Sequence, residues 1–403
     1  MHMKYHILVF ALLAGFAISC EREISTEQAD RFIKFYGNYM MDEARDVEAL
    51  DDGGFAICGI DSLPGVGKRM VLIVTDEFGN LKSGFPKYYP ESDTVIGAAA
   101  NAIVPIRGGQ GGFLLAGYVE LQVEGSAETQ KDIYLVKVSS TGDLNWPRTY
   151  GSADDEVILD ATERISSGFM LAGYKVKDGK SAILIMGIEQ EGDSITPGYP
   201  PSLYTQNSSA NYILNTGDRY VCICTYDKLG HPELTDMLAL CFDDGLFPNA
   251  RRLSGDSNEQ ATCIIEDGPN SYLALGNRII GGRSEIVIHQ LETNDQLYIT
   301  QSELLKTISE SNMDLIGKRF VKTEDGRYAI VGTLQSGGDR QIFLQLLTPD
   351  KDPSVRVVYG ASGDQYGADI DNSNDGGFVL LGTTGFEENS MISLIKTNDT
   401  GDL

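Results

Sequence analysis

One pattern of polar and apolar positions recurs seven times along the chain. Each copy has a polar turn, an aromatic residue and a short apolar run, and most copies end in Gly, as in residues 112–117 (GFLLAG). The copies lie 50 to 58 residues apart, without helical spacing of apolar residues between them, and their aromatic residues are Phe55, Phe113, Phe169, Tyr220, Tyr272, Tyr328 and Phe378. Repeats of this length built from short strands are typical of a β-propeller. We expect these rings to be buried between adjacent blades.

A single repeat shows how each blade folds. In residues 154–202, apolar runs at 156–162, 169–174 and 182–188 predict three strands, and a weaker fourth strand follows residue 193. Short strands between turns rich in Gly, Ser and Asp are typical of an antiparallel meander. The sequence therefore predicts an all-β, seven-bladed propeller over residues 31–403, with four strands per blade, named a, b, c and d in chain order.

The last repeat lacks its own fourth strand. Strand c of this repeat is predicted at 392–397, and only six residues follow it. Residues 31–37 (RFIKFYG) match strand d of other repeats, such as the segment that ends at Tyr359. We therefore predict that residues 31–37 pair with 392–397 as the outer strand of the last blade. Such closure covers an otherwise free sheet edge.

The N-terminal segment differs from the repeats. An apolar stretch at residues 7–16 is too short to span a bilayer as a permanent helix, and it leads into residues 17–20 (AISC). A small residue before a Cys at the end of an apolar segment resembles the lipobox of bacterial lipoproteins. The alternative is an ordinary cleaved signal peptide in which Cys20 is incidental.

The lipobox resemblance implies a processing route and a location. It implies a signal peptide over residues 1–19, diacylglycerol on the sulfur of Cys20, and a lipid-anchored linker over residues 20–30. Glu21 after the Cys favours the outer membrane over the inner one. We therefore expect a lipid-anchored outer-membrane protein that is periplasmic or surface-exposed.

The repeats also resemble known propeller classes. The strand order is similar to that of WD40-like and kelch-like propellers, and the DGGF and LLAG segments resemble secreted or lipid-anchored bacterial propellers over residues 31–403. The Trp-Asp dipeptide, the sialidase Asp box and the repeated quinoprotein Trp motif are absent from the sequence. The resemblance implies the fold and no assigned chemistry. Trp146, the only Trp, is predicted to pack between blades.

Charge limits the classes of partner. The formal net charge is -26 at pH 7, with acidic residues scattered along the chain. This argues against nucleic acid or an anionic lipid surface as a partner, so we expect membrane attachment through the lipid anchor only. The charge permits divalent cations, although an acidic surface also serves solubility alone. We expect a monomer.

The cysteines predict no cofactor. Five follow Cys20, which is an odd number: Cys58, Cys222, Cys224, Cys241 and Cys263. Four of these five lie within apolar strand runs. Buried free thiols are therefore the prediction, although the expected compartment would allow disulfides. Their spacing matches no zinc motif, and we predict neither a metal nor another cofactor.

The two faces of the predicted ring differ. Strand alternation places the a–b and c–d turns on one face, the turn face, and the b–c and d–a connections on the other, the loop face. The turns are short and rich in Gly, Asn and Asp, as structural turns require. The loop-face segments vary in length: 61–68, 119–131, 200–209, 226–235 and 304–313. Variable loops on a rigid scaffold often carry function, and unconstrained variation is the alternative.

Charges of opposite sign recur on the loop face. Acidic residues lie near the start of strand a, and basic residues lie just before strand c. The acids are Asp42, Glu43, Asp93, Asp154 to Glu156, Glu259 and Asp364, and the bases are Arg69, Lys131, Lys180, Arg283 and Arg340. This placement predicts cross-loop ion pairs that hold the blades in register. A charged rim that binds a cation or a glycan is the alternative.

The loop face also holds the candidate binding residues. They are Tyr118, Tyr174, Tyr204, Tyr226, His231, Arg69, Arg283 and Arg340. No partners can be placed beside His231 for a Ser-His-Asp site, and His289 lies in an apolar strand. Two loop carboxylates would suffice for a glycosidase, but 58 acidic residues make chance pairs certain.

These observations predict a non-catalytic, lipid-anchored cell-envelope propeller. We expect it to bind a protein or glycan partner through its loop face. The alternative is a propeller glycoside hydrolase or polysaccharide lyase that acts on extracellular glycans.

Overall fold

The computed structural model describes most of the chain after the N-terminal segment. The described residues are 30–38, 40–65, 67–90, 96–107, 111–198, 207–228, 231–245, 248–253, 258–360 and 363–403. All regular elements in these ranges are β-strands, and no helix there is long and apolar enough to cross a membrane. The predicted signal peptide, the linker up to residue 29 and Cys20 lie outside the described residues.

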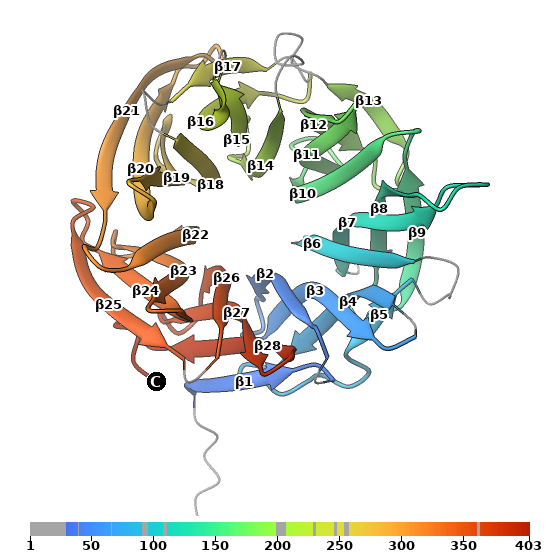
Figure 1. Ribbon diagram of the computed structural model, residues 1–403, viewed down its shortest axis with the longest axis horizontal. Coiled ribbons are helices and arrows are strands. Elements are labelled where there is room, and N and C mark those ends of the chain that lie inside the picture. The colour runs from blue at the N-terminus through green and yellow to red at the C-terminus, as the bar shows by residue number, and fades with distance from the viewer. Residues whose placement is uncertain are drawn as a thin grey trace, which may run out of the picture. The chain divides into compact units, whose positions relative to one another are not determined.

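Seven strands line the centre of a ring formed by residues 31–403 (Figure 1). They are the predicted strands a: β2 (Glu43–Ala49), β6 (Gly97–Pro105), β10 (Asp155–Glu163), β14 (Ser208–Asn215), β18 (Asn258–Gly268), β22 (Asp314–Lys322) and β26 (Gln365–Asn372). Each pairs with a strand b: β3 (Phe55–Leu63), β7 (Phe113–Gln122), β11 (Phe169–Lys177), β15 (Tyr220–Lys228), β19 (Ser271–Ile280), β23 (Tyr328–Ser336) and β27 (Phe378–Phe386).

Two further sets of strands lie outside these. The strands c are β4 (Gly67–Thr75), β8 (Thr129–Val138), β12 (Lys180–Ile188), β16 (His231–Phe242), β20 (Arg283–Thr293), β24 (Asp339–Leu347) and β28 (Asn389–Thr397). The outermost strands are β5 (Lys87–Tyr89), β9 (Leu144–Tyr150), β13 (Ser194–Gly198), β17 (Asn249–Arg252), β21 (Ile299–Ile308), β25 (Pro353–Tyr359) and β1 (Phe32–Tyr36).

Hydrogen bonds join these strands into five four-stranded antiparallel sheets and one eight-stranded sheet. The larger sheet contains two successive meanders, β2 to β5 and β6 to β9, joined by one parallel pairing of Lys68 with Gly97. The pairing forms because the three-residue β5 covers β4 only from Met70 to Leu72. The prediction of four-stranded propeller blades is confirmed. The prediction of seven separate blades is wrong, because only five blades stand as separate sheets.

The predicted closure of the ring by the N-terminal strand is confirmed. Strand β1 pairs antiparallel with β28, from Phe32 opposite Lys396 to Tyr36 opposite Ile392. The Tyr36 hydroxyl donates a hydrogen bond of 2.7 Å to the carbonyl oxygen of Gly79, on the turn after β4. The first repeat and the last are therefore connected by both backbone and side-chain contacts.

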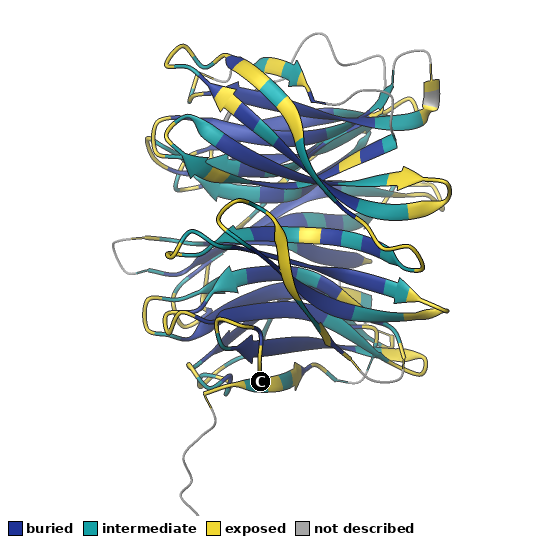
Figure 2. Cartoon of the chain, turned by 90° about the vertical axis from the view of Figure 1, so that its left-hand side faces the viewer, coloured by how far each residue is buried: buried dark blue, intermediate teal, exposed yellow. Residues whose placement is uncertain are grey.

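The repeated aromatic residues form the predicted interior. Phe113 is 5% exposed and the other six are at most 2% exposed. Phe169 packs with Leu114 and Trp146 of the preceding repeat, so the apolar core lies between successive sheets, where Figure 2 shows the buried strand segments. The predicted packing of Trp146 is confirmed. Its indole N–H also donates to the carbonyl oxygen of Gln190 at 3.2 Å.

Polar residues also connect successive repeats. In four of the strands b, the motif ends in Gly or Cys and a polar residue follows it. The side chain of that polar residue accepts a hydrogen bond from a backbone amide of the next inner strand. Thr225 accepts from Ala261, Asn277 from Gly317, Thr333 from Gly367 and Thr383 from Ala44, at 2.8 to 3.1 Å. These bonds satisfy buried backbone donors at the interfaces between sheets.

The five cysteines in the described part of the chain are buried and free, as predicted. Cys222 and Cys224 lie on the same face of β15, with their sulfur atoms 3.7 Å apart. Burial raises the pKa of the Cys263 thiol to about 12 and that of Cys222 well above its usual range. These thiols act as small apolar side chains in the core.

Several predicted loops are wrong, because the strands extend into them. Of segment 119–131, only residues 123–128 lie between strands β7 and β8. Strand β21 extends through Ile308 and so includes the first half of segment 304–313. Segment 226–235 belongs mostly to β15 and β16, and 61–68 to β3 and β4. Backbone pairing continues through these polar residues because it requires no apolar side chains. Residues 200–206 lie outside the described part.

Candidate functional site

Each of the seven inner strands carries a β-bulge at an equivalent position. The pairing register shifts by one residue after Ala44, Ala100, Ile158, Ala210, Ala261, Gly317 and Gly367. The extra residues, which we call the bulge residues, are Arg45, Asn101, Leu159, Asn211, Thr262, Lys318 and Ala368. A bulge bends its strand and redirects side chains. At each bulge, two consecutive side chains of the inner strand can therefore point toward the centre of the ring.

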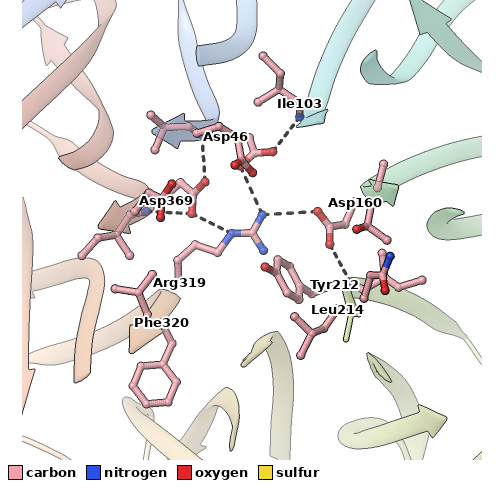
Figure 3. A pocket seen from close by; sticks show the side chains of 17 residues that line it. Asp46, Ile103, Asp160, Tyr212, Leu214, Arg319, Phe320 and Asp369 are labelled. Carbon is pink, nitrogen blue, oxygen red and sulfur yellow. Dashed lines mark hydrogen bonds and ion pairs between the residues drawn. The ribbon is translucent and has the colours of Figure 1, made fainter. Parts of the chain in front are cut away.

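Arg319, which follows one bulge residue, lies at the centre of a buried charge cluster (Figure 3). Its Nε donates to Asp369 Oδ1 at 3.0 Å, and its Nη2 lies 3.8 Å from Asp160 Oδ1 and 4.0 Å from Asp46 Oδ1. Its guanidinium also lies 4.3 Å from the centroid of the Tyr212 ring. One side chain from β22 thus contacts β26, β10, β2 and β14.

The three carboxylates of this cluster also bind the backbone of the next repeat. Asp46 Oδ2 accepts from the amide of Ile103 at 2.8 Å, and Asp160 Oδ2 accepts from Ile213 at 2.7 Å. Asp369 Oδ2 accepts from Val47 at 3.0 Å across the junction of the last and first repeats. Each Asp directly follows a bulge residue, so the bulge aims a carboxylate at the neighbouring strand.

Burial changes the protonation of the acids around Arg319. It raises the pKa of Asp160 to about 7, although the positive charge of Arg319 opposes this shift. It also raises the pKa of Asp369 and Glu48 well above the usual range, and the charges of Asp46 and Asp371 raise that of Glu48 further. The cluster therefore holds protons near neutral pH. These acids line a cavity of about 210 Å³ between Arg319 and the turn face.

A larger groove of about 460 Å³ lies at the opposite, loop-face ends of β2 and β26. Met41, Glu43 and Arg45 line it from the first repeat, Asp364 and Tyr366 from the last, and Lys318 from β22. Two of these, Arg45 and Lys318, are bulge residues. We call this space the loop-face groove.

Lys318 is the distinctive side chain of the loop-face groove. Within the described residues its ammonium group makes no hydrogen bond and no ion pair. Burial, followed by the positive charges of Arg45 and Arg319, lowers the pKa of Lys318. The groove therefore holds a cation that lacks an acidic partner.

The acids of the loop-face groove, in contrast, are paired. Glu43 Oε2 lies 2.5 Å from Arg45 Nη2, and Glu43 Oε1 lies 3.6 Å from Lys68 Nζ. Asp364 Oδ2 accepts from Arg340 Nη1 at 2.9 Å, and the same nitrogen donates to the Tyr366 hydroxyl at 3.0 Å. The predicted cross-loop ion pair is confirmed for Arg340 and Asp364. The Tyr366 side chain is fixed beside the groove, and the residue is 41% exposed.

The structure places the other predicted site residues on separate repeats. Arg69 pairs with Asp61 of its own hairpin at 2.5 Å and stacks 4.1 Å from the Tyr88 ring centroid, rather than pairing with an acid at the start of strand a. His231 is exposed, with Nδ1 3.2 Å from Glu233 Oε1. Arg283 is exposed at the start of β20.

The predicted aromatic platforms differ in accessibility. Tyr118 and Tyr174 are half-buried, and Lys131 Nζ lies 4.7 Å from the Tyr118 ring centroid. The expectation that Tyr226 is an accessible platform is wrong, because this residue is 2% exposed and its hydroxyl bonds to Asp236 Oδ2 at 3.2 Å. Tyr204 lies outside the described residues.

Sequence reasoning missed Arg45, Lys318, Arg319 and Tyr366. A signal for three of them does exist. Each strand a has a small or apolar residue, usually Ala or Gly, directly before the bulge residue. In Ala44-Arg45-Asp46 and Gly317-Lys318-Arg319, two charged residues follow that position and interrupt the expected alternation. Such an interruption within an otherwise regular strand indicates a bulge.

No protein-family model matches the sequence, and no curated protein sequence matches it either. The resemblance of the repeats to bacterial lipoprotein propellers therefore stays a prediction.

Solved structures show a similar fold. The extracellular region of plexin A4 is similar with a TM-score of 0.53 and 7% identity, over 90% of this chain and 51% of that chain. The periplasmic gluconolactonase of Pseudomonas aeruginosa is similar with a TM-score of 0.51 and 8% identity, over 86% of this chain and 97% of that chain. This chain thus spans about half of the plexin chain and nearly all of the gluconolactonase chain. At these identities the likeness supports the β-propeller architecture alone.

Proposed function

We propose that this chain is a seven-bladed β-propeller of the bacterial cell envelope that binds a protein or glycan partner without changing it chemically. The two meanders of the eight-stranded sheet count as two blades in this proposal. The observation that carries it is the loop-face groove, which is lined both by Lys318, a cation without an ion-pair partner among the described residues, and by the exposed Tyr366. Concave sites with a few convergent polar groups are typical of ligand binding.

Binding is favoured over catalysis by the state of the groove acids. Glu43 and Asp364 are both held in ion pairs, with Arg45 and Arg340 respectively. A catalytic acid or base must be free to reach the substrate, whereas both of these carboxylates already contact a cationic side chain. The hydroxyl groups that line the groove belong to Tyr366, Thr383 and Ser390, and the Tyr366 hydroxyl is engaged by Arg340. The groove therefore supports recognition better than acid–base chemistry.

A hydrolase is the second candidate function. The observation that favours it is the raised pKa of Asp160 and Glu48 in the central cavity, because a carboxyl group protonated near neutral pH is a candidate general acid. The fold is also shared with a gluconolactonase. Against this function, Asp160 binds both Arg319 and the backbone of Ile213, which are structural contacts.

Attachment to the membrane is part of the proposal and rests on the segment that ends in Cys20. We expect Cys20→Ala to abolish incorporation of a labelled fatty acid and to move the protein from the membrane to the soluble fraction, because the thiolate that accepts the lipid is removed. Cys58→Ala provides a matched control, since that thiol is buried in the described fold. Labelling that persists in the Cys20 variant would show that the lipid is attached elsewhere or that the anchor is wrong.

The binding face is tested by locating a bound partner. We expect an envelope protein or glycan captured by the protein lacking residues 1–20 to slow hydrogen exchange at the loop-face groove, and Tyr366→Ala to weaken its capture. Tyr298→Ala is a matched control, because this tyrosine is also exposed but follows the c–d turn between β20 and β21, on the turn face. Protection confined to the turn face would contradict the proposal. Turnover of a lactone or polysaccharide that is lost in Asp160→Asn would favour the hydrolase.

A further inference from the structure

Two bases and two acids line the loop-face groove, although the chain as a whole is strongly acidic. Its two acids, Glu43 and Asp364, are paired with Arg45, Lys68 and Arg340. Lys318 is additional to these pairs and, within the described residues, makes no ion pair. Four bases thus accompany two acids around the groove.

The surroundings of Lys318 favour an anion beside it. Lys318 is exposed to solvent within the groove, but the surrounding protein atoms and two nearby cations, Arg45 and Arg319, lower its pKa. Arg45 and Arg319 are already paired with carboxylates, whereas Lys318 has no acidic partner among the described residues, so a negative charge beside Lys318 would be stabilising. A carboxylate between Lys318 and Arg45 would supply that charge and would accept hydrogen bonds from both groups.

The volume of the groove and the net charge of the chain limit the kind of anion that can bind there. The groove volume of about 460 Å³ lies within the range of about 300–1,000 Å³ found for small-molecule sites. The net charge of -26 would repel a long polyanion, whereas one carboxylate experiences mainly its immediate neighbours. The groove is therefore suited to a short ligand with a single acidic group at its bound end.

The remaining groups favour a sugar over an acidic peptide. The carboxylates of Glu43 and Asp364 can accept hydrogen bonds from sugar hydroxyl groups, whereas further carboxylates of an acidic peptide would be repelled by them. The Tyr366 ring is held by Arg340 through its hydroxyl and offers a fixed apolar surface at the groove edge. Rigid aromatic surfaces contribute contact area at a small entropic cost.

We propose that the loop-face groove binds a uronic acid residue of a glycan, with Lys318 and Arg45 on the carboxylate and Tyr366 against the sugar ring. This inference rests on the proposed binding function and names its ligand class. Glu43 and Asp364 act as acceptors for the sugar hydroxyls. In this proposal the ligand is bound and released chemically unchanged.

The experiment is a calorimetric titration of the protein lacking residues 1–20 with uronic acid disaccharides and with their methyl esters. The glucuronate, galacturonate and mannuronate forms are the probes. The esters keep the shape and hydroxyl groups of the sugar and remove only the charge. We expect at least one acid to bind and its ester to bind at least about tenfold more weakly, which corresponds to about 1.4 kcal/mol. Lys318→Met should cause a similar loss of affinity.

Two further measurements separate binding from folding. Lys318→Met should melt at the same temperature as the parent protein or slightly above it, because the substitution removes a cation from beside two others. A purely structural role for Lys318 would lower the melting temperature instead. Lys180→Met is the matched control, since Lys180 is an exposed lysine at the start of β12, and it should bind the acid like the parent.

Several outcomes would overturn the ligand assignment. They are equal affinity for acid and ester, unchanged affinity in Lys318→Met, absence of binding to all three acids up to millimolar concentration, or tighter binding of a short acidic peptide. Each of these leaves the proposed function intact if a captured partner still protects the loop-face groove from exchange. Protection restricted to the turn face would instead contradict both proposals.

Discussion

Deletion of residues 31–37 should destabilise the whole fold and expose a sheet edge that promotes aggregation. Strand β1 pairs with β28 on its outer side over five residue pairs, from Ile392 to Lys396. Its Tyr36 is 8% exposed, packs against Val71 and Leu394, and bonds to the turn at Gly79. Loss of one large buried aromatic side chain costs about 3–5 kcal/mol. Loss of the entire strand should exceed that value and leave β28 as an unprotected edge.

The measurement is urea unfolding together with light scattering after size-exclusion chromatography. We expect the deletion variant to be insoluble, or soluble as aggregates with a much lower unfolding midpoint. Single substitutions on the two faces of β1 give a finer test. Tyr36→Ala should cost about 3–5 kcal/mol, whereas Ile33→Ser, at a position that is 40% exposed, should change stability by less than about 0.5 kcal/mol. A monomeric deletion variant with an unchanged midpoint would show that β1 does not close the ring.

The closing strand and the strand-b positions were predictable because each depends on a local pattern that recurs. The Gly-aromatic-apolar segment around Phe113 has six counterparts, and buried strands at regular intervals admit few architectures. The segment around Phe35 was identified by comparison with other outer strands rather than by its own pattern. Repetition therefore supplied information that a single strand of five residues lacks.

The exact sheet boundaries were not predictable from the same patterns. The pairing of Lys68 with Gly97 depends on the shortness of β5, which covers only three residues of β4. The long hairpin of β7 and β8 continues through polar residues such as Glu120, opposite Lys131. Hydropathy does not report backbone hydrogen bonds of this kind, so the segment was predicted to be a loop.

The candidate site was only partly accessible to sequence reasoning. The acids Glu43 and Asp364 were placed correctly at the starts of inner strands, and Arg340 was placed beside strand c. Lys318 and Arg45 come from repeats at opposite ends of the chain and meet only because the ring closes. Their shared bulge position becomes apparent once the register of all seven inner strands is compared.

Replacement of Arg319 by Met should destabilise the protein by about 3–5 kcal/mol near pH 8. Removal of one partner from a buried ionic cluster leaves the other charges uncompensated, which is far more costly than loss of a surface ion pair. Here the remaining charges are Asp46, Asp160 and Asp369, which are 4 to 6% exposed. Arg319→Lys should be less damaging, because it keeps the charge but loses the planar contact with Tyr212 and the fork of donors.

The loss in Arg319→Met should depend on pH in a defined direction. Burial already raises the pKa of Asp160 to about 7 in the folded protein, above its unfolded value of about 3.9, so the folded state binds more protons than the unfolded state between these values. The contribution of the Asp160 carboxyl group to the free energy of unfolding is therefore fully present below about pH 4 and is lost as pH rises through about 7. Arg319 lowers the pKa of both Asp160 and Asp369, so its removal raises them further and extends the loss to higher pH.

The difference in unfolding free energy between parent and Arg319→Met should thus be small at pH 5 and largest at pH 8. Urea titrations at both pH values measure it, and the comparison between variants cancels groups that titrate identically in both proteins. Asp160→Asn in the Arg319→Met background should recover part of the loss at pH 8, because it removes one of the uncompensated charges. A loss that is equal at both pH values, or that stays below about 1 kcal/mol, would contradict the view that Arg319 neutralises buried carboxylates from three other inner strands and thereby holds the centre of the ring together.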